Sequence, residues 1–166
     1  MATPQRIAIT GASGLIGSAL VGHLKSEGHT VQRLVRRDPV SPDEVKWDPK
    51  TGYVDLEALR GVDAIIHLAG AGVGDKRWSK KYKSEILNSR LLGTTAIAHA
   101  VNEVKPQVFI SASAIGWYGE SGNRSVVESD RVGEDFLAAV CREWEGAADL
   151  VTDVRTVKIR TGLVLD

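Results

Sequence analysis

The stretch "RIAITGASGLIGSALVGHLKSEGHTVQRLVRR", residues 6–37, decides the fold. It opens on a short run rich in β-branched residues, 6–10, which predicts a strand. Apolar residues then recur every four positions from Ile16 to Leu24, as they do on one face of a helix. A second strand is expected over 29–37. A strand, a glycine-rich turn, a helix and a second strand together predict one unit of a parallel α/β sheet.

The rest of the chain keeps this alternation. Further strands are predicted over 44–47, 62–70, 107–113 and 154–165, and helices over 56–61, 79–104 and 133–150. The stretch "VDAIIHLAG", 62–70, is almost continuously apolar, as strands buried on both faces of a parallel sheet are. The sequence therefore predicts an α/β fold with a doubly wound (Rossmann) parallel sheet, helices on both faces and about six strands. Residues 1–166 are expected to form one domain.

Composition limits the partners. The 21 basic and 21 acidic residues give a net charge of zero, whereas a protein that binds nucleic acid needs a basic excess. The sequence contains neither an apolar run of about 20 residues nor a signal-peptide pattern, so we expect no membrane association. The single cysteine, Cys141, suits a reducing cytoplasm. The four histidines are scattered, and no Cys/His cluster has metal-ligand spacing.

The motif "GASGLIG" joins the first predicted strand to the first predicted helix. Gly11 permits a tight turn, Gly14 lets the backbone approach a pyrophosphate, and Gly17 lets the helix pack closely on the sheet. The helix N-terminus would offer N–H groups and a positive dipole end to phosphates, and Ser13 could add a hydroxyl donor. A turn that uses its glycines only for packing is the alternative. The position between a strand and a helix favours the pyrophosphate of a dinucleotide.

The end of the second strand bears on which dinucleotide binds. An acidic residue there would hydrogen-bond the ribose hydroxyls of NAD. This chain instead has Arg36 and Arg37, and no carboxylate precedes Asp38. An arginine at this place can pair with the 2′-phosphate of NADP through a bidentate fork. We therefore expect NADP rather than NAD, with two solvated surface arginines as the alternative.

Several motifs along the chain point to one family. They are "TGASGLIG" at 10–17, "HLAGAG" at 67–72, "GDKRW" at 74–78, "FISASAIGWYG" at 109–119, "GEDFL" at 133–137, "CREWE" at 141–145 and "RTGLVL" at 160–165. With these motifs the chain resembles the short-chain dehydrogenase/reductase superfamily, in its extended and atypical branches, which include the NAD-dependent epimerase/dehydratases. Within them it is similar to the YfcH-type subgroup of epimerase family proteins.

The resemblance implies roles at matching positions. The pyrophosphate would be held by Gly11, Ser13, Gly14, Leu15 and Ile16. The phosphate on the adenosine would be met by Arg36, with Arg37 as a second candidate. The adenine side of the cofactor would lie beside Leu68, Ala69 and Gly70, and the nicotinamide end beside Ser111, Ala112 and Ser113.

The chain departs from the superfamily at the proton-transfer pair, a tyrosine followed four residues later by a lysine. None of the three tyrosines has a lysine at that spacing, and the matching positions hold Leu137 and Cys141. Ser113 and Tyr118 remain as candidate catalytic residues. Ser113 could orient a carbonyl, and Tyr118 could act as an acid if Arg77 or Arg90 lay near it. The alternative for Tyr118 is an aromatic side chain that packs its loop.

Arg90 is a second departure, because extended members carry an asparagine at this position. Two interpretations stay open: a cation near the cofactor or a substrate anion, and a cation on a helix surface.

Three functions remain open at this point. The first is the NADP(H)-binding domain of an atypical reductase or sugar-nucleotide epimerase-like enzyme that acts on an unknown small molecule. The second is a non-catalytic NADPH-binding redox sensor or scaffold, and the third is a phosphate-binding regulatory domain. Extended members continue into segments that form the substrate site, so we expect the substrate-binding C-terminal part to be absent from residues 1–166. An unpaired final strand would expose a sheet edge compatible with a homodimer.

Overall fold

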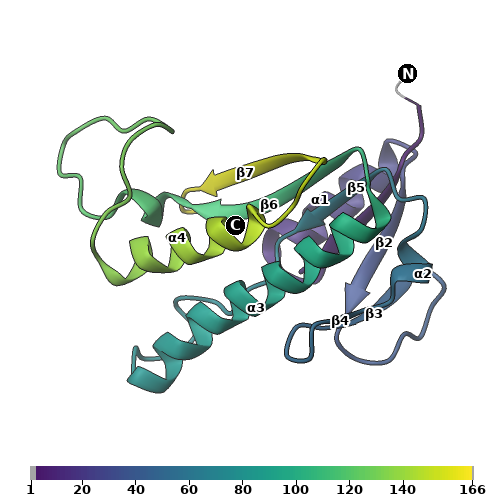
Figure 1. Cartoon of the computed structure of the whole chain (residues 1–166), viewed down its shortest axis with the longest axis horizontal. Helices are drawn as coiled ribbons and strands as arrows, with labels where there is room; N and C mark the ends of the chain where they lie inside the picture. Colours follow the sequence, from purple (N-terminus) through teal and green to yellow (C-terminus); the bar gives the residue numbers. More distant parts are fainter. Residues whose placement is uncertain (1–2, 166) are drawn as a thin grey trace.

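The computed structural model describes residues 3–165, which form a sheet of seven strands (Figure 1). In chain order the strands are β1 (Arg6–Thr10), β2 (Thr30–Val35), β3 (Glu44–Asp48), β4 (Tyr53–Val54), β5 (Ala64–His67), β6 (Val108–Ala114) and β7 (Arg155–Thr161). Across the sheet their order is β4-β3-β2-β1-β5-β6-β7. The only antiparallel neighbours in this described sheet are β3 and β4. The predicted doubly wound α/β fold is confirmed.

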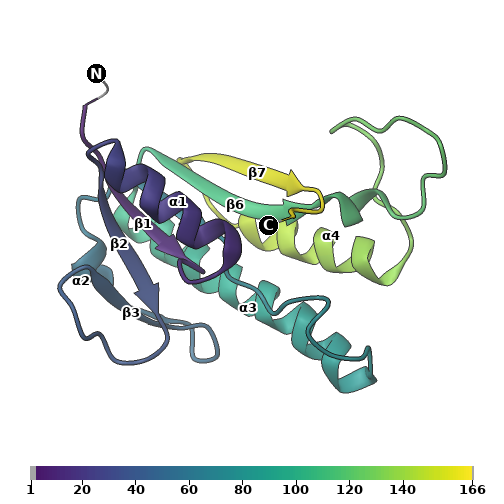
Figure 2. The same cartoon turned by 180° about the vertical axis from the view of Figure 1, so that it is seen from behind.

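Helices cover both faces of this sheet. They are α1 (Leu15–Ser26), α2 (Leu56–Leu59), α3 (Lys80–Val104) and α4 (Phe136–Ala148), with a 3₁₀ turn η1 (Ile115–Tyr118) after β6. Figure 1 shows α3 and α4 in front of the sheet, and Figure 2 shows α1 in front of its other face. The six predicted strands are all present. The prediction missed β4, because two residues are too few to show an alternating pattern.

Two apolar layers hold the helices to the sheet. Under α3, the side chains of Ile65, Ile97 and Phe109 are fully buried in the larger core. On the opposite face, Ile9 and Val31 are buried below α1. The burial of these apolar side chains is the main stabilising contribution to the fold, at about 25 cal/mol per Å² removed from water.

The strand order places a switch point between β1 and β5. The chain leaves β1 toward β2 on one side, and later adds β5 on the other side. The carboxyl ends of the two strands are aligned, because Thr10 pairs with His67 in the parallel register. Loops diverge at such a point and leave a crevice in which ligands of open α/β sheets bind. In residues 3–165, every helix is too short or too polar to cross a membrane.

Candidate functional site

The turn after β1 is built around glycines. Gly11 has φ +69°, and a Cβ on it would lie 2.9 Å from the backbone nitrogen of Ala69. A Cβ on Gly17 would lie 2.1 Å from the carbonyl oxygen of Gly11. The fold therefore requires both glycines. Gly14 differs, because its φ is −77° and a Cβ would meet only the Gly11 oxygen, at an ordinary 3.4 Å.

Gly14 is also the N-cap of α1, and no side chain caps this helix. Leu15 and Ile16, in its first turn, are 50% and 43% exposed. Backbone N–H groups in a first turn have no partner within the helix, and the helix dipole places partial positive charge there. Ser13 lies on the same turn and is exposed. The structure thus brings together the five residues expected at a pyrophosphate, on an open surface that suits an anion.

A buried hydrogen-bond cluster joins this turn to the loop after β5. The Thr10 hydroxyl accepts from the backbone N–H groups of Leu68 and Ala69, at 3.1 and 3.2 Å. Its own proton is then directed to Nδ1 of His67, 2.7 Å away. Burial lowers the pKa of His67 to about 3, so the imidazole is neutral at physiological pH. Sequence reasoning did not identify this pair, although both residues end strands at the switch point.

Arg90 supports the same loop from α3. Its Nη1 donates to the carbonyl oxygen of Ala71 at 2.9 Å, and its guanidinium lies 4.9 Å from the ring centre of Trp144. A Cβ on Gly70 would come within 3.2 Å of the guanidinium carbon, so the missing side chain makes room for Arg90. Burial lowers the pKa of Arg90. The interpretation of Arg90 as a purely surface cation is therefore wrong: it lies between α3, α4 and the loop.

The two arginines after β2 have different surroundings. Arg37 forms a bidentate ion pair with Glu44, with Nη1–Oε2 and Nη2–Oε1 distances of 2.8 and 2.5 Å. Arg36 is exposed, and no residue within 3–165 accepts a hydrogen bond from its guanidinium. Sequence reasoning placed Arg36 first, with Arg37 as a second candidate, and did not include Glu44.

At the end of β6, Ser113 lies in a buried polar network. Its hydroxyl donates to Oε1 of Glu145 at 2.6 Å, and Arg160 of β7 donates to both oxygens of that carboxylate, at 2.8 and 3.0 Å. Burial raises the pKa of Glu145, but the hydrogen bonds from Arg160 and Ser113 outweigh it and hold the pKa below its usual value. Ser111 is also buried, and it donates to the neighbouring carbonyl of Ala112.

Tyr118 belongs to the same network. Its hydroxyl accepts from Nη1 of Arg160 at 3.1 Å, and the Arg160 guanidinium carbon lies 3.9 Å from the ring centre of Trp117. The cation beside Tyr118 is therefore Arg160, whereas sequence reasoning considered Arg77 and Arg90. A hollow of about 600 Å³ opens here, lined by Tyr118, Glu145 and Arg160, together with Ile115, Val126, Glu128, Lys158 and Ile159.

Cys141 faces the end of β6, with its sulfur 3.7 Å from the carbonyl oxygen of Ala114. Burial raises the pKa of this thiol, which keeps it protonated. Leu137 packs against η1, since a Cβ on Gly116 would lie 3.2 Å from its side chain. Neither residue can replace a tyrosine and lysine pair in proton transfer. Among residues 3–165, acidic residues, histidines and the cysteine form no group that could hold a metal ion.

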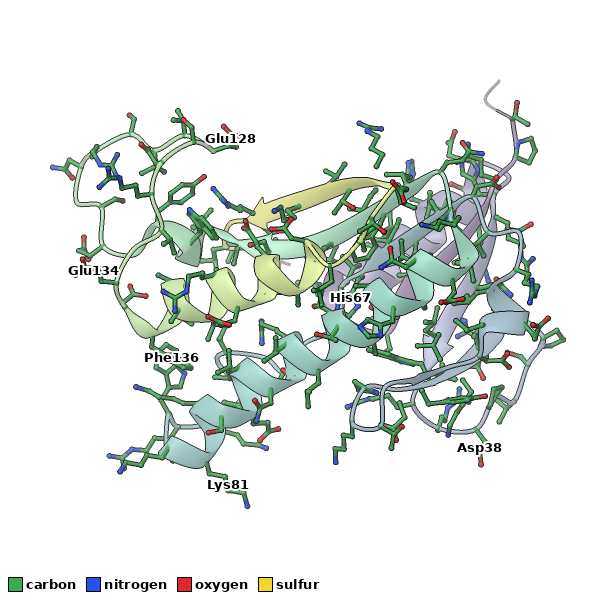
Figure 3. The ribbon with its side chains drawn as sticks, in the orientation of Figure 1. Asp38, His67, Lys81, Glu128, Glu134 and Phe136 are labelled. Atoms are coloured by element: carbon green, nitrogen blue, oxygen red, sulfur yellow. The ribbon has the colours of Figure 1, made fainter. Side chains whose placement is uncertain are left out.

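The candidate positions follow the carboxyl edge of the sheet. Figure 3 shows Asp38, in the loop after β2, at one side of the molecule and Glu128, in the loop after η1, at the other, with His67 between them. Arg36 therefore lies on the β2 side of the switch point, and Tyr118 lies on the β6 side. An elongated ligand that crossed the switch point would have the glycine turn at its middle.

Comparisons with known proteins agree with this arrangement. The family model described as NAD dependent epimerase/dehydratase matches residues 7–136. An epimerase family protein of Mycobacterium leprae is 42% identical over 161 residues, which are 96% of this chain and 52% of that protein. The chain spans about half the length of the curated relatives it matches.

Solved structures share the fold. The nucleoside-diphosphate sugar epimerase from Corynebacterium glutamicum superposes with a TM-score of 0.82 at 39% identity, over 95% of this chain and 34% of that one. The human epimerase family protein SDR39U1, solved with NADPH, has a TM-score of 0.84 at 29% identity, over 96% of this chain and 54% of that one. The family match and these relatives confirm the resemblance inferred from the motifs. The chain belongs to the NAD dependent epimerase/dehydratase family.

Proposed function

We propose that this chain binds NADP(H) and is the cofactor domain of an atypical short-chain dehydrogenase/reductase. Gly14 is the observation that carries the proposal. The fold itself leaves room for a Cβ at this position, so it does not require glycine here. A ligand that closely approaches the backbone from the solvent side explains why the residue is glycine. The uncapped first turn of α1 lies directly beside it, and a pyrophosphate fits both features.

The preference for NADP rests on Arg36. This side chain is exposed at the end of β2, where the ribose of the adenosine half lies in dinucleotide-binding sheets. An arginine there recognises a 2′-phosphate, whereas NAD recognition uses a carboxylate. The human relative that was solved with NADPH supports the same assignment.

For the whole protein, we propose hydride transfer on a small polar substrate, as in an oxidoreductase or a sugar-nucleotide epimerase-like enzyme. When bound, the nicotinamide would supply the hydride in a net reduction, or would take it from the substrate and return it in an epimerisation. Tyr118 is the candidate proton donor, and Arg160 would remain a hydrogen-bond donor to its oxygen after the proton had left. Ser113 already donates its proton to Glu145, so its oxygen could only accept a hydrogen bond from a substrate.

Leu137 and Cys141 favour a second candidate function, a non-catalytic NADPH-binding sensor or scaffold. Both stand where the proton-transfer pair would be, and the Cys141 thiol is buried and protonated. Turnover separates the two functions. A reductase will consume NADPH with some member of a panel of aldehydes and ketones. An epimerase will interconvert sugar nucleotides without net consumption of the cofactor, and Tyr118→Phe will abolish either turnover. A sensor will bind NADPH equally well and show neither.

Titration of the chain with NADPH and NADH, followed by nucleotide fluorescence, tests the binding. We expect NADPH to bind at least about tenfold tighter than NADH, as one added charge-assisted contact would give. Arg36→Ala should remove this difference. Arg155→Ala is the matched control, because Arg155 begins β7 at the opposite edge of the sheet and is also exposed to solvent. Equal affinity for the two nucleotides would rule out the NADP preference.

A further inference from the structure

We infer that Arg37 and Glu44 form a latch that holds Arg36 in place for the adenosine phosphate, and that Arg37 itself does not contact the nucleotide. This inference rests on the proposed binding of NADP(H). It gives the two adjacent arginines different roles: Arg36 binds the phosphate, and Arg37 holds Arg36 in position.

The Glu44 carboxylate is the centre of the latch. Its side chain is 1% exposed, on the first residue of β3. Oε1 is contacted by Nη2 of Arg37 and, at 3.3 Å, by Nη2 of Arg33, while Oε2 accepts from Nη1 of Arg37 and from the backbone N–H of Val40, 2.9 Å away. A carboxylate that is so enclosed is stable only while these donors remain, because a buried charge without partners is costly.

Other contacts fix the rest of the loop between β2 and β3. Lys46 donates to the carbonyl oxygen of Arg36 at 2.9 Å and to the carboxylate of Asp38 at 2.8 Å. Ser41 and Arg33 both donate to the carboxylate of Asp43. The backbone on both sides of Arg36 is therefore held by β3, and among the charged side chains of this loop only that of Arg36 has no partner in residues 3–165.

Charge pairing separates the two arginines. Residues 33–46 contain four cations and three carboxylates. Arg33 pairs with Asp43 and also contacts Glu44, Arg37 pairs with Glu44, and Lys46 pairs with Asp38. Lys25 of α1 adds a longer contact to Asp43. Arg36 is the cation that these pairs leave uncompensated. A dianionic phosphate is attracted to it, whereas Arg37 could turn to the phosphate only by giving up both of its contacts with the buried Glu44 carboxylate, which would keep only Arg33 and the Val40 amide.

Four variants test the latch by titration with NADPH and with NADH: Arg36→Ala, Arg37→Ala, Glu44→Gln and the double variant Arg37→Ala/Glu44→Gln. We expect Arg36→Ala to weaken NADPH binding at least about tenfold, as the loss of a direct charge-assisted contact does. Each latch single variant should weaken it about three- to fivefold, because the loop must then be ordered on binding. The double variant should lose no more than either single variant, and NADH affinity should stay within about twofold throughout.

Three outcomes would overturn the latch. If Arg37 contacts the phosphate directly, Arg37→Ala will be as damaging as Arg36→Ala. If Glu44 merely competes with the phosphate for Arg37, Glu44→Gln will bind NADPH as well as the wild-type chain or more tightly. If the two residues act independently, their effects will add in the double variant. Arg60→Ala is the control, since Arg60 also forms a two-contact ion pair, with Glu57, but on exposed α2.

Amide hydrogen exchange tests the latch without nucleotide. The Val40 amide should exchange slowly in the wild-type chain and at least about tenfold faster in Arg37→Ala and Glu44→Gln. Fast exchange in the wild-type chain would disprove the latch, whatever the chain binds. If the chain binds neither nucleotide, the proposed function fails, and the exchange experiment still decides whether the latch exists.

Discussion

The Thr10 hydroxyl donates its proton to Nδ1 of His67 at 2.7 Å, and its oxygen accepts two backbone N–H groups at the same time. This one side chain therefore contacts three polar groups at the switch point of the sheet: the buried imidazole and the two half-buried amides. It holds the loop after β5 against the glycine turn, where the backbone of Ala69 lies so close to Gly11 that a Cβ would not fit.

Replacement of Thr10 by valine tests this arrangement. Valine has nearly the same shape but no hydroxyl, so Thr10→Val leaves Nδ1 of His67 and the Ala69 amide without a hydrogen-bond partner, while the Leu68 amide keeps the Thr10 carbonyl oxygen at 3.3 Å. We expect the free energy of unfolding in urea to fall by about 1–3 kcal/mol. Thr156→Val is the control, because that hydroxyl makes a single local hydrogen bond to the carbonyl of Val154. An equal loss in both variants would show that the cluster has no special role.

His67 makes stability depend on pH. Its pKa falls from the ordinary 6.5 to about 3 in the folded chain, so the unfolded chain binds more protons between these values. The contribution of His67 to the free energy of unfolding is therefore complete above pH 6.5. It falls as the pH drops toward 3, by up to about 1.4 kcal/mol per pH unit. His67→Gln, which cannot titrate, should be less stable at pH 7 but should lose less between pH 6.5 and 4.5. Urea unfolding at several pH values measures this difference. If the free energy of unfolding changes with pH in the same way in the wild-type chain and in His67→Gln, the prediction is contradicted.

Alanine should have different effects at Gly14 and Gly17: at the first it should weaken nucleotide binding, and at the second it should destabilise the fold. Gly14→Ala meets no backbone clash, so we expect a stability loss of about 1 kcal/mol at most, from the weaker N-cap. Nucleotide affinity should nevertheless fall at least about tenfold, for NADPH and NADH alike, because the methyl group occupies the place of the pyrophosphate.

Gly17→Ala places a methyl group 2.1 Å from the Gly11 oxygen, so the helix must shift. We expect it to lower the unfolding free energy by about 1–3 kcal/mol or more. Thermal unfolding and nucleotide titration of both variants separate the two effects. Unchanged affinity in Gly14→Ala would contradict the pyrophosphate site.

Arg160 and Glu145 should contribute strongly to stability as a pair. Arg160→Met leaves the Glu145 carboxylate, 4% exposed, without its cation. We expect a loss of about 3–5 kcal/mol in urea unfolding, much of which the double variant Glu145→Leu/Arg160→Met should recover. Lys158→Met in the same strand is the control: it breaks a more exposed pair with Asp149 and should cost about 1 kcal/mol or less. If both methionine variants lose the same amount, the pair makes no special contribution.

Much of the fold could be predicted from the sequence, because its signals are local. Apolar runs and four-residue periodicity mark the strands and helices, and Gly11 and Gly17 mark the turn between β1 and α1. The short β4 is missed because only its pairing with β3 defines it. The paired ends of β1 and β5 follow from strand order, which the alternation of elements restricts to few topologies.

The polar contacts of the candidate site could not be predicted in the same way. Arg37 and Glu44 are seven positions apart, yet they meet only because β2 and β3 lie parallel with Arg33 opposite Glu44. Ser113 and Glu145 are separated by 32 positions, and packing of α4 on β6 brings them together. A single sequence shows which charges exist but not how they pair, and the pairing decides which arginine remains available.

The hydrogen bonds and ion pairs that fix the loop between β2 and β3 also determine at which step its conformational entropy is lost, on folding or on nucleotide binding. Each residue that becomes ordered loses about 1–2 kcal/mol of backbone freedom, and residues 36–43 lose it when the chain folds. A nucleotide that arrives at this edge finds the backbone already ordered, and only the Arg36 side chain still has to be immobilised. Discrimination between the two nucleotides should therefore appear mainly as a slower dissociation of NADPH, with similar association rates for both.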